Sequence, residues 1–143
     1  MNVKTILATK GGDVISIEPG ADLAAAVKLL SKHRIGAVLI RGAGGRLAGI
    51  LSERDIVHAL AEHGTAALAL QVAQVMTRNV TTCGEDDTIA SLMEQMTAGK
   101  FRHVPVVTNG ELVGLVSIGD IVKHRVGEIE HESEALRDYI RTA

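Results

Sequence analysis

The strongest constraint on this chain is an internal repeat that fills most of its 143 residues. The segment GILSERDIV at 49–57 matches GLVSIGDIV at 114–122, and Asp22 and Asp87 are separated by the same offset. A fixed offset of this kind indicates two copies of one supersecondary unit. Because a copy of about sixty residues buries little apolar surface alone, we expect the two halves to pack on each other.

The two copies have the same order of expected elements. In the first copy, apolar periodicity predicts a strand at Val14–Ile17, a helix at 22–34, strands at Ala37–Ile40 and Leu47–Leu51, and a helix from Ser52. In the second copy it predicts the same order at Val80–Thr82, 87–99, Val104–Val107 and Leu112–Val116, and from Ser117. Asp22 and Asp87 are the expected N-caps of the first helices. The expected fold is therefore α+β, with tandem β-α-β-β-α repeats packed about a pseudo-twofold axis.

Turn residues set the expected boundaries. The segments Gly42-Ala43-Gly44-Gly45 and Asn109-Gly110 each separate two β-rich runs, which is typical of hairpins. The expected domains are a first repeat at 1–65, a second repeat at 66–125 and a helical tail at 126–143.

The tail departs from the repeat. Its apolar stripe alternates spacings of four and three residues, as in a coiled coil; the stripe consists of Val122, Val126, Ile129, Ser133, Leu136 and Ile140. One interpretation is a long final helix packed on its own domain. The other is a contact with a partner or with a second copy of the chain.

Composition argues against several classes of protein. Fifteen Lys and Arg against seventeen Asp and Glu give a net charge of −2, and Phe101 and Tyr139 are the only aromatic residues. Nucleic-acid surfaces use basic charge and stacking rings, so the sequence disfavours one. Cys83 is the only cysteine, which excludes an internal disulfide and suggests the reducing cytoplasm. We expect neither a membrane span nor a signal peptide.

A Gly-x-x-Ser-x-x-Asp motif lies at a strand-to-helix junction in each copy, with Ser52 and Asp55 in the first and Ser117 and Asp120 in the second. One interpretation is a capping box, in which the serine and the acid satisfy free N–H groups of the helix. The other is a nucleotide site. There the helix N-terminus and the serine bind phosphate, and the aspartate accepts hydrogen bonds from ribose hydroxyls. The spacing alone leaves both open.

Basic residues distinguish the second copy. Arg102 and His103 precede its hairpin, and pairing of the two strands would bring them close to Ser117. Two basic side chains beside a helix N-terminus form a suitable anion site. The first copy has Gly36 and Ala37 at the matching places. We therefore expect the second copy to bind an anionic ligand more tightly than the first.

These features together resemble the cystathionine-β-synthase (CBS) domain pair, or Bateman module. The resemblance rests on both Ser-x-x-Asp segments, on FRHVPVV at 101–107 and on VMTRNV at 75–80, and it covers about residues 1–125. It implies an adenosine ligand such as AMP, ADP, ATP, NAD(H) or S-adenosylmethionine in the cleft between the repeats. It also implies a regulatory role without chemistry, and a homodimer.

The resemblance also assigns roles to individual residues. Asp120 and Asp55 would hold ribose; Ser117, Ser52, Arg102 and His103 would contact phosphate, with Arg54 reaching the ligand of the other half; Val80, Thr81, Ile15 and Ser16 would lie against adenine.

Two other groups of residues give only weak evidence of a functional site. His124, Glu128 and His131 share one helix face, but three polar residues on one helix are usually a charged surface, so no metal site is expected. Cys83 has no base at a recognisable position, and free cysteines are most often small buried apolar residues. We therefore expect no catalytic residue.

The sequence thus predicts a cytoplasmic, non-enzymatic sensor of an adenine nucleotide that signals energy or redox state to an unidentified partner protein. The alternative is a ligand-free dimeric scaffold in which Ser-x-x-Asp is only a helix cap. Loss of ligand binding on substitution of Asp120 would separate the two, because a cap contributes only about 1 kcal/mol of stability.

Overall fold

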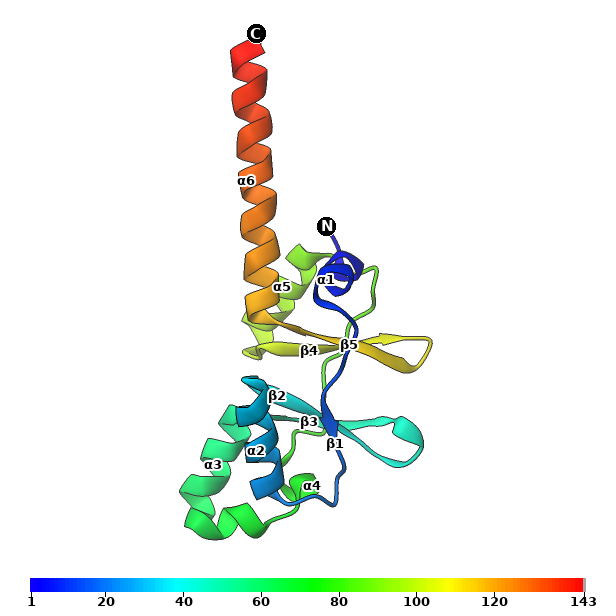
Figure 1. Cartoon of the computed structure of the whole chain (residues 1–143), viewed down its shortest axis with the longest axis vertical. Helices are drawn as coiled ribbons and strands as arrows, with labels where there is room; N and C mark the ends of the chain where they lie inside the picture. Colours follow the sequence, from blue (N-terminus) through cyan, green and yellow to red (C-terminus); the bar gives the residue numbers. More distant parts are fainter. Residues whose placement is uncertain (143) are drawn as a thin grey trace. The chain divides into compact units, whose positions relative to one another are not determined.

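The computed structural model describes residues 1–142 and divides into two compact units (Figure 1). Unit 2 is the continuous segment Asp13–Thr81, whereas unit 1 combines Met1–Gly12 with the chain from Thr82 onward. The first twelve residues therefore belong with the second copy of the repeat. No helix in the described part of the chain is both long and apolar enough to cross a membrane.

Unit 2 contains the first copy of the repeat. Its elements are β1 (Ser16–Ile17), α2 (Leu23–His33), β2 (Ala37–Arg41), the 3-10 turn η1 (Ala43–Gly45), β3 (Leu47–Ser52), α3 (Glu53–His63), the 3-10 segment η2 (Gly64–Ala69) and α4 (Val72–Val75). The sheet order is β1-β2-β3, with β1 parallel and β3 antiparallel to β2. The helices of the unit cover one face of this sheet (Figure 1).

Unit 1 contains the second copy and an added helix. Its elements are α1 (Val3–Lys10), α5 (Ile89–Gly99), β4 (His103–Thr108), β5 (Glu111–Ser117) and α6 (Ile118–Thr142). β4 and β5 form an antiparallel pair, and α1 lies beside them through Leu7, which packs over Gly114 of β5. The expected long C-terminal helix is confirmed: α6 runs without a break from the end of β5.

Each unit buries an apolar core of its own. In unit 2 the fully buried side chains include Leu23, Val38, Ile40 and Leu51, which come from the first helix and the sheet. In unit 1 α1 takes part directly, because Val3 and Ile6 are fully buried among residues of α5 and the hairpin. Burial of α1 explains why the beginning of the chain belongs to the second copy.

The predicted hairpins are confirmed. The residues Asn109 and Gly110 have φ of 52° and 79°, the left-handed geometry of a tight two-residue turn. In the first copy the glycine-rich segment turns through Gly44 and Gly45, which have φ of 71° and 75°. Asp22 is confirmed as the N-cap of α2, because its side chain accepts a hydrogen bond from the Ala25 N–H at 2.9 Å.

Two expected features of the second copy were wrong. The strand predicted at Val80–Thr82 does not form, because the Val80 N–H donates to the Arg78 carbonyl in a tight turn. Pairing with β4 occurs only at Cys83, as one parallel bridge to Val106. The N-cap of α5 is Thr88 and not Asp87, whose carboxylate instead accepts from the Gly84 N–H at 2.8 Å.

The expected first strand is also shorter than predicted. β1 contains only Ser16 and Ile17, and the residues before it do not pair as a strand. The Ile15 carbonyl still accepts a hydrogen bond from the Leu39 N–H at 3.3 Å. The first copy therefore keeps a third strand beside its hairpin, whereas the second copy keeps a single bridge.

Candidate functional site: two matching strand-to-helix junctions

The junction between β5 and α6, here called the Asp120 junction, is a complete capping box. The Asp120 N–H donates to Ser117 Oγ at 3.2 Å, and the Ser117 N–H donates to Asp120 Oδ2 at 2.9 Å. The Ser117 hydroxyl also donates to the same carboxylate oxygen at 3.0 Å. These bonds fix both side chains at the N-terminus of a long helix, where the helix dipole favours an anion.

The start of β4 lies directly beside this junction. His103 pairs with Ser117 in the antiparallel register, and the Ile118 N–H donates to the Arg102 carbonyl at 2.8 Å. The expected pairing of the second hairpin is thereby confirmed. Arg102 is exposed and His103 is half-buried. The end of the hairpin where α6 begins thus brings together a hydroxyl, a carboxylate, a guanidinium and an imidazole from Ser117, Asp120, Arg102 and His103.

Lys10, at the last turn of α1, contributes a further charge that the sequence analysis missed. Its Nζ donates to Asp120 Oδ2 at 2.6 Å and to the Leu115 carbonyl at 2.7 Å. Both partners are more than a hundred residues away in the sequence, so neither periodicity nor spacing indicates the contact. The sequence offers one indirect signal, because residues 3–7 (VKTIL) resemble residues 72–76 (VAQVM), which indicates that the beginning of the chain is part of the repeat.

The charge state of Asp120 follows from these contacts. Partial burial acts to raise the pKa of its carboxyl group, but the hydrogen bonds from Lys10 and Ser117 and the positive charge of Lys10 outweigh that effect. The pKa of Asp120 therefore lies below its usual value, and the group is a carboxylate at neutral pH. An ionised carboxylate is the stronger acceptor for ribose hydroxyls.

The junction between β3 and α3, here called the Asp55 junction, repeats the capping box. The Ser52 N–H donates to Asp55 Oδ2 at 2.9 Å, and the Asp55 N–H donates to Ser52 Oγ at 3.4 Å. In place of Lys10, the Thr77 hydroxyl donates to Asp55 Oδ1 at 3.2 Å. A neutral hydroxyl thus takes the place of a cation. Thr77 was not predicted as a site residue either.

The backbone around the Asp55 junction matches the second copy bond for bond. Ala37 pairs with Ser52, and the Glu53 N–H donates to the Gly36 carbonyl at 3.0 Å. Gly36 and Ala37 are therefore the structural counterparts of Arg102 and His103, as the repeat predicted. The first copy has the same main-chain frame without the two basic side chains.

The remaining predicted residues occupy three places. Arg54 is exposed in the first turn of α3, where the second copy has Gly119. Ile15 and Ser16 lie beside β2 on the side opposite to β3, the strand that ends at Ser52. All four residues belong to unit 2, but β2 separates Ile15 and Ser16 from Ser52 and Asp55.

Val80 and Thr81 end the segment of unit 2, whereas Ser117, Asp120 and Arg102 belong to unit 1. The bridge register also changes which residues correspond to the β1 pair. Ile17 pairs with Ile40 in the first copy, and Cys83 forms the matching bridge to Val106 in the second copy. Cys83 is therefore the counterpart of Ile17. The counterparts of Ile15 and Ser16 are therefore residues 81 and 82, one position later than the predicted pair.

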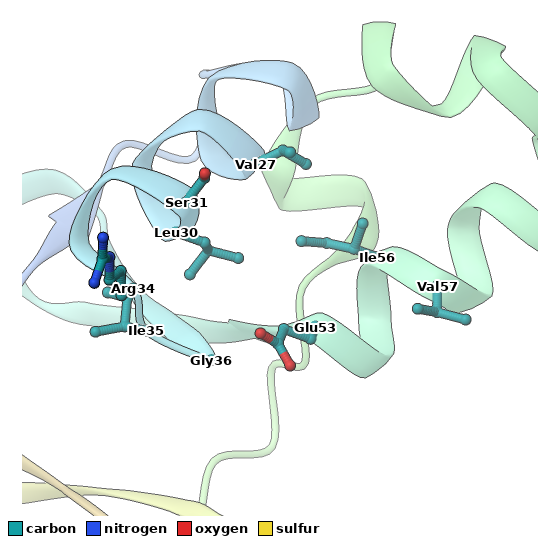
Figure 2. A pocket seen from close by; sticks show the side chains of 9 residues that line it. All are labelled: Val27, Leu30, Ser31, Arg34, Ile35, Gly36, Glu53, Ile56 and Val57. Carbon is teal, nitrogen blue, oxygen red and sulfur yellow. The ribbon is translucent and has the colours of Figure 1, made fainter.

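A pocket of about 590 Å³ opens in unit 2 between the end of α2 and the start of α3 (Figure 2). Leu30 and Ile56 point toward one another across it, and Arg34 and Glu53 supply opposite charges along its lining (Figure 2). None of the predicted ligand residues lines this pocket. It therefore lies beside the Asp55 junction without including the Ser52–Asp55 pair.

The histidines of α6 and the single cysteine show no sign of a metal site or of a reactive thiol in the described residues. Within residues 1–142 no cluster of His, Cys, Asp and Glu has an arrangement that could hold a metal ion. Glu128 pairs instead with Arg125 at 2.8 Å, and His124 Nδ1 lies 2.9 Å from the Asp120 carbonyl oxygen.

Cys83 is a buried thiol, and burial together with the charge of Asp87 raises its pKa to about 12. The thiolate needed for nucleophilic or redox chemistry is therefore scarce at neutral pH.

Comparison with known proteins identifies both copies. A family model described as the CBS domain matches residues 3–62 and 72–127. The mitochondrial CBS domain-containing protein CBSX3 of Arabidopsis thaliana is 32% identical over 120 residues, which is 81% of this chain and 58% of that protein. An uncharacterised 17.7 kDa protein of Acidianus ambivalens is 32% identical over 122 residues, or 85% of this chain and 71% of that protein. The chain thus spans little more than half the length of the plant relative.

Solved structures agree with these sequence matches. The CBS-domain containing protein ATU1752 of Agrobacterium tumefaciens is 47% identical, with a TM-score of 0.85 over 87% of this chain and 92% of that one. The CBS domain pair of protein MJ0100 was solved in complex with 5′-methylthioadenosine and S-adenosyl-L-methionine. It is 31% identical, with a TM-score of 0.79 over 90% of this chain and 98% of that one.

Proposed function

This chain belongs to the CBS domain family, and we propose from that premise that it is a regulatory module that binds an adenosine-containing ligand at the Asp120 junction. A similar domain pair binds 5′-methylthioadenosine and S-adenosyl-L-methionine, which share an adenosine group. The observation that carries the proposal is the capping box at Ser117 and Asp120 with Arg102, His103 and Lys10 around it. A carboxylate acceptor and several cationic donors suit a ribose next to a phosphate.

We further propose that the physiological ligand is a phosphorylated adenosine of the AMP, ADP, ATP or NAD(H) kind. The Asp120 carboxylate accepts from the ribose hydroxyls, and Arg102 and the N-terminus of α6 bind phosphate. For a ligand at the Asp55 junction, Ile15 and Ser16 contact adenine in this scheme. The family resemblance gives Val80 and Thr81 the same role, and it gives Arg54 a role in phosphate binding. The Asp55 junction holds the same groups without the basic pair and binds more weakly.

A second candidate is a ligand-free scaffold, and one observation favours it. Both junctions form complete capping boxes, so Ser52, Asp55, Ser117 and Asp120 already have a structural role. Duplication copies a helix cap as readily as a binding site. The two candidates differ in what they require around the box, because a cap has no use for Arg102 and Lys10.

The decisive experiment compares matched variants of the two junctions. AMP, ATP, NAD and S-adenosylmethionine are first screened by thermal shift, where a ligand at a hundred times its Kd adds about 2.7 kcal/mol. Calorimetric titration of the best ligand then uses wild type, Asp120→Ala and Asp55→Ala. We expect Asp120→Ala to abolish the tight phase and Asp55→Ala to leave most of it. If no adenine compound binds wild type, the scaffold is correct; if Asp55→Ala is the damaging change, the main site is at the other junction.

We also propose that the module has no catalytic activity of its own and acts through a homodimer and a regulated partner protein. With a single cysteine the chain cannot form an internal disulfide, and we propose that it works in the reducing cytoplasm. Incubation of the adenosine ligand with the protein, followed by chromatography, tests the first point. Recovery of the ligand unchanged is expected, and conversion to a product would contradict it.

A further inference from the structure

The outer part of α6 stands clear of the rest of unit 1 (Figure 1). From Ile129 to the end of the described helix every residue is exposed, including Leu136, Tyr139 and Ile140 at 60%, 71% and 65%. A single helical segment of this length is marginally stable in water. Large apolar side chains on one stripe of such a helix are instead typical of a surface that packs on another helix.

The charges of the outer segment stabilise a single helix only in part. Opposite charges lie three residues apart at Arg125 and Glu128, which form an ion pair, and at Glu134 and Arg137. Neighbours four residues apart carry like charges: Glu128 and Glu132, Glu130 and Glu134, Glu134 and Asp138, and Arg137 and Arg141. Like charges at this spacing are destabilising. Gly127, exposed within the helix, lowers its intrinsic stability further. The sequence is therefore better suited to a helix that has a partner.

The same charges are complementary between two copies. With the apolar stripe as the a and d positions of a heptad, Val126, Ser133 and Ile140 are a positions and Val122, Ile129 and Leu136 are d positions. The g positions then include Arg125 and Glu132, and the e positions include Glu130 and Arg137. In a parallel pair each g residue faces the e residue five positions later in the other chain. Arg125 thus meets Glu130 of the second copy, and Glu132 meets Arg137.

We propose that α6 pairs with α6 of a second copy of this chain as a parallel, in-register, two-stranded coiled coil. The proposal rests on the homodimer included in the proposed function and is independent of its ligand. Both charge pairs occur twice by symmetry. Val126 and Ile140 at a positions and Leu136 at a d position are residues that two-stranded coils prefer, whereas the β-branched Val122 and Ile129 at d positions do not select two strands. The number of strands therefore follows from the proposed homodimer.

Antiparallel pairing is less favourable in either register that fits the stripe. The register that buries the whole stripe brings Glu130 against Glu130, Glu132 against Glu132 and Lys123 against Arg137 across the seam. A shift by one heptad relieves this repulsion but leaves Val122 and Val126 without partners. Only the parallel arrangement buries all of the stripe and pairs opposite charges along it.

Cysteine cross-linking tests the orientation directly. Facing a positions of a parallel pair come within the span of a disulfide, whose Cα atoms lie about 4.4–6.8 Å apart. Full-length Ser133→Cys treated with oxidised glutathione should form a covalent dimer on non-reducing gels. Ala135→Cys, on the outer face of the helix, is the matched control and should remain monomeric on the same gels. The native Cys83 is buried and reacts little.

Cross-linking of Ala135→Cys as readily as Ser133→Cys would overturn the proposal. So would the absence of cross-linking in Ser133→Cys, because each antiparallel register places Ser133 opposite a different residue. This test keeps its meaning even if the units dimerise elsewhere, since it reports on α6 alone.

Charge reversal tests the pairing of Glu132 with Arg137. By sedimentation, Glu132→Arg and Arg137→Glu should each weaken self-association by about tenfold, because each replaces two attractive contacts by two repulsive ones. The double variant, or a mixture of the two single variants, should recover wild-type association. Asp138→Arg, which reverses one charge on the outer face, should change little.

Unchanged association of the single variants, or failure of the double variant to recover, would contradict the proposed register. Calorimetric titration with the adenosine ligand is run on the same variants. Retained ligand binding with lost association separates a fault in the dimer from a fault in the proposed ligand site. Loss of ligand binding in wild type, with cross-linking intact, indicates the reverse.

Discussion

The two strand-to-helix junctions share a backbone and differ in what surrounds it. Each has the same serine and aspartate in the same capping box, and each donates the same main-chain hydrogen bond to the residue just before the neighbouring strand. Around Asp120 lie Lys10, Arg102 and His103; around Asp55 lie Thr77, Gly36 and Ala37. The comparison shows that both copies keep the capping box and its main-chain hydrogen bond, whereas the basic side chains around it occur in one copy only.

The helices beside the junctions differ in a second way. In unit 2, Ile35 and Glu53 line an open pocket between α2 and α3. Their counterparts in the repeat are Phe101 and Ile118, which pack against the core of unit 1. At the start of the second helix the first copy thus has a charged side chain where the second copy has an apolar one.

The largest expected effect concerns the basic pair. Arg102→Ala should weaken AMP binding by more than tenfold and leave adenosine nearly unchanged, because a charge-assisted bond to phosphate contributes about 1.5–3 kcal/mol and adenosine has no phosphate. Calorimetric titration with both compounds measures the two values. Arg46→Ala, an exposed arginine in the first hairpin, is the control. An equal loss for AMP and adenosine would show that Arg102 does not contact the phosphate.

The next largest effect is on stability, at the glycine of each hairpin that another segment of the same unit approaches closely. A Cβ at Gly49 would lie 2.7 Å from the Thr77 carbonyl oxygen, whereas a Cβ at Gly114 would lie 2.5 Å from the flexible end of Leu7. Gly49→Ala should therefore cost about 1–3 kcal/mol of unfolding free energy, and Gly114→Ala should cost less. Urea denaturation at neutral pH compares them. The opposite order would mean that the backbone at Thr77 yields more easily than Leu7.

The capping boxes should contribute equally in the two copies. Ser52→Ala and Ser117→Ala each remove one acceptor for a helix N–H, so each should lower the unfolding free energy by about 1 kcal/mol. The two values are measured without ligand. Ser31→Ala, in the body of α2, serves as the control and should have almost no effect. A much larger loss at one junction would show that its serine does more than cap a helix.

The smallest expected effect is a pH dependence. The lowered pKa of Asp120 stabilises the fold above the ordinary pKa of the carboxyl group, about 3.9, and this stabilisation is lost as pH falls through the lowered value. Lys10→Met should narrow the gap between unfolding free energies at pH 7 and in acid. The change should stay within the range of about 0–1 kcal/mol of exposed ion pairs. Lys4→Met on the same helix should leave the gap unchanged, and an unchanged gap in Lys10→Met would refute the coupling.

Local patterns predicted most of the fold and the two strand-to-helix junctions, but not every group that surrounds them. The pairing of His103 with Ser117 followed from a short hairpin, whose turn fixes its register. The contact between Lys10 and Asp120 could not be predicted, because it depends on α1 packing against the second copy rather than the first. The third strand of the second copy was misplaced for a related reason. Pairing with β4 occurs at Cys83, after the tight turn at Val80. Apolar periodicity gives no indication of that turn.

The division of the chain into a continuous and a split unit has a consequence for how the protein is made. Asp13–Thr81 can complete its core as soon as it leaves the ribosome. α1 is synthesised before that segment, yet its buried residues Val3 and Ile6 belong to a core whose other members, from Cys83 onward, are all synthesised after it. At about 5–20 residues per second, this helix waits several seconds with its apolar face uncovered. On ribosome-bound chains stalled beyond residue 81, hydrogen exchange should therefore show a protected unit 2 and an unprotected α1.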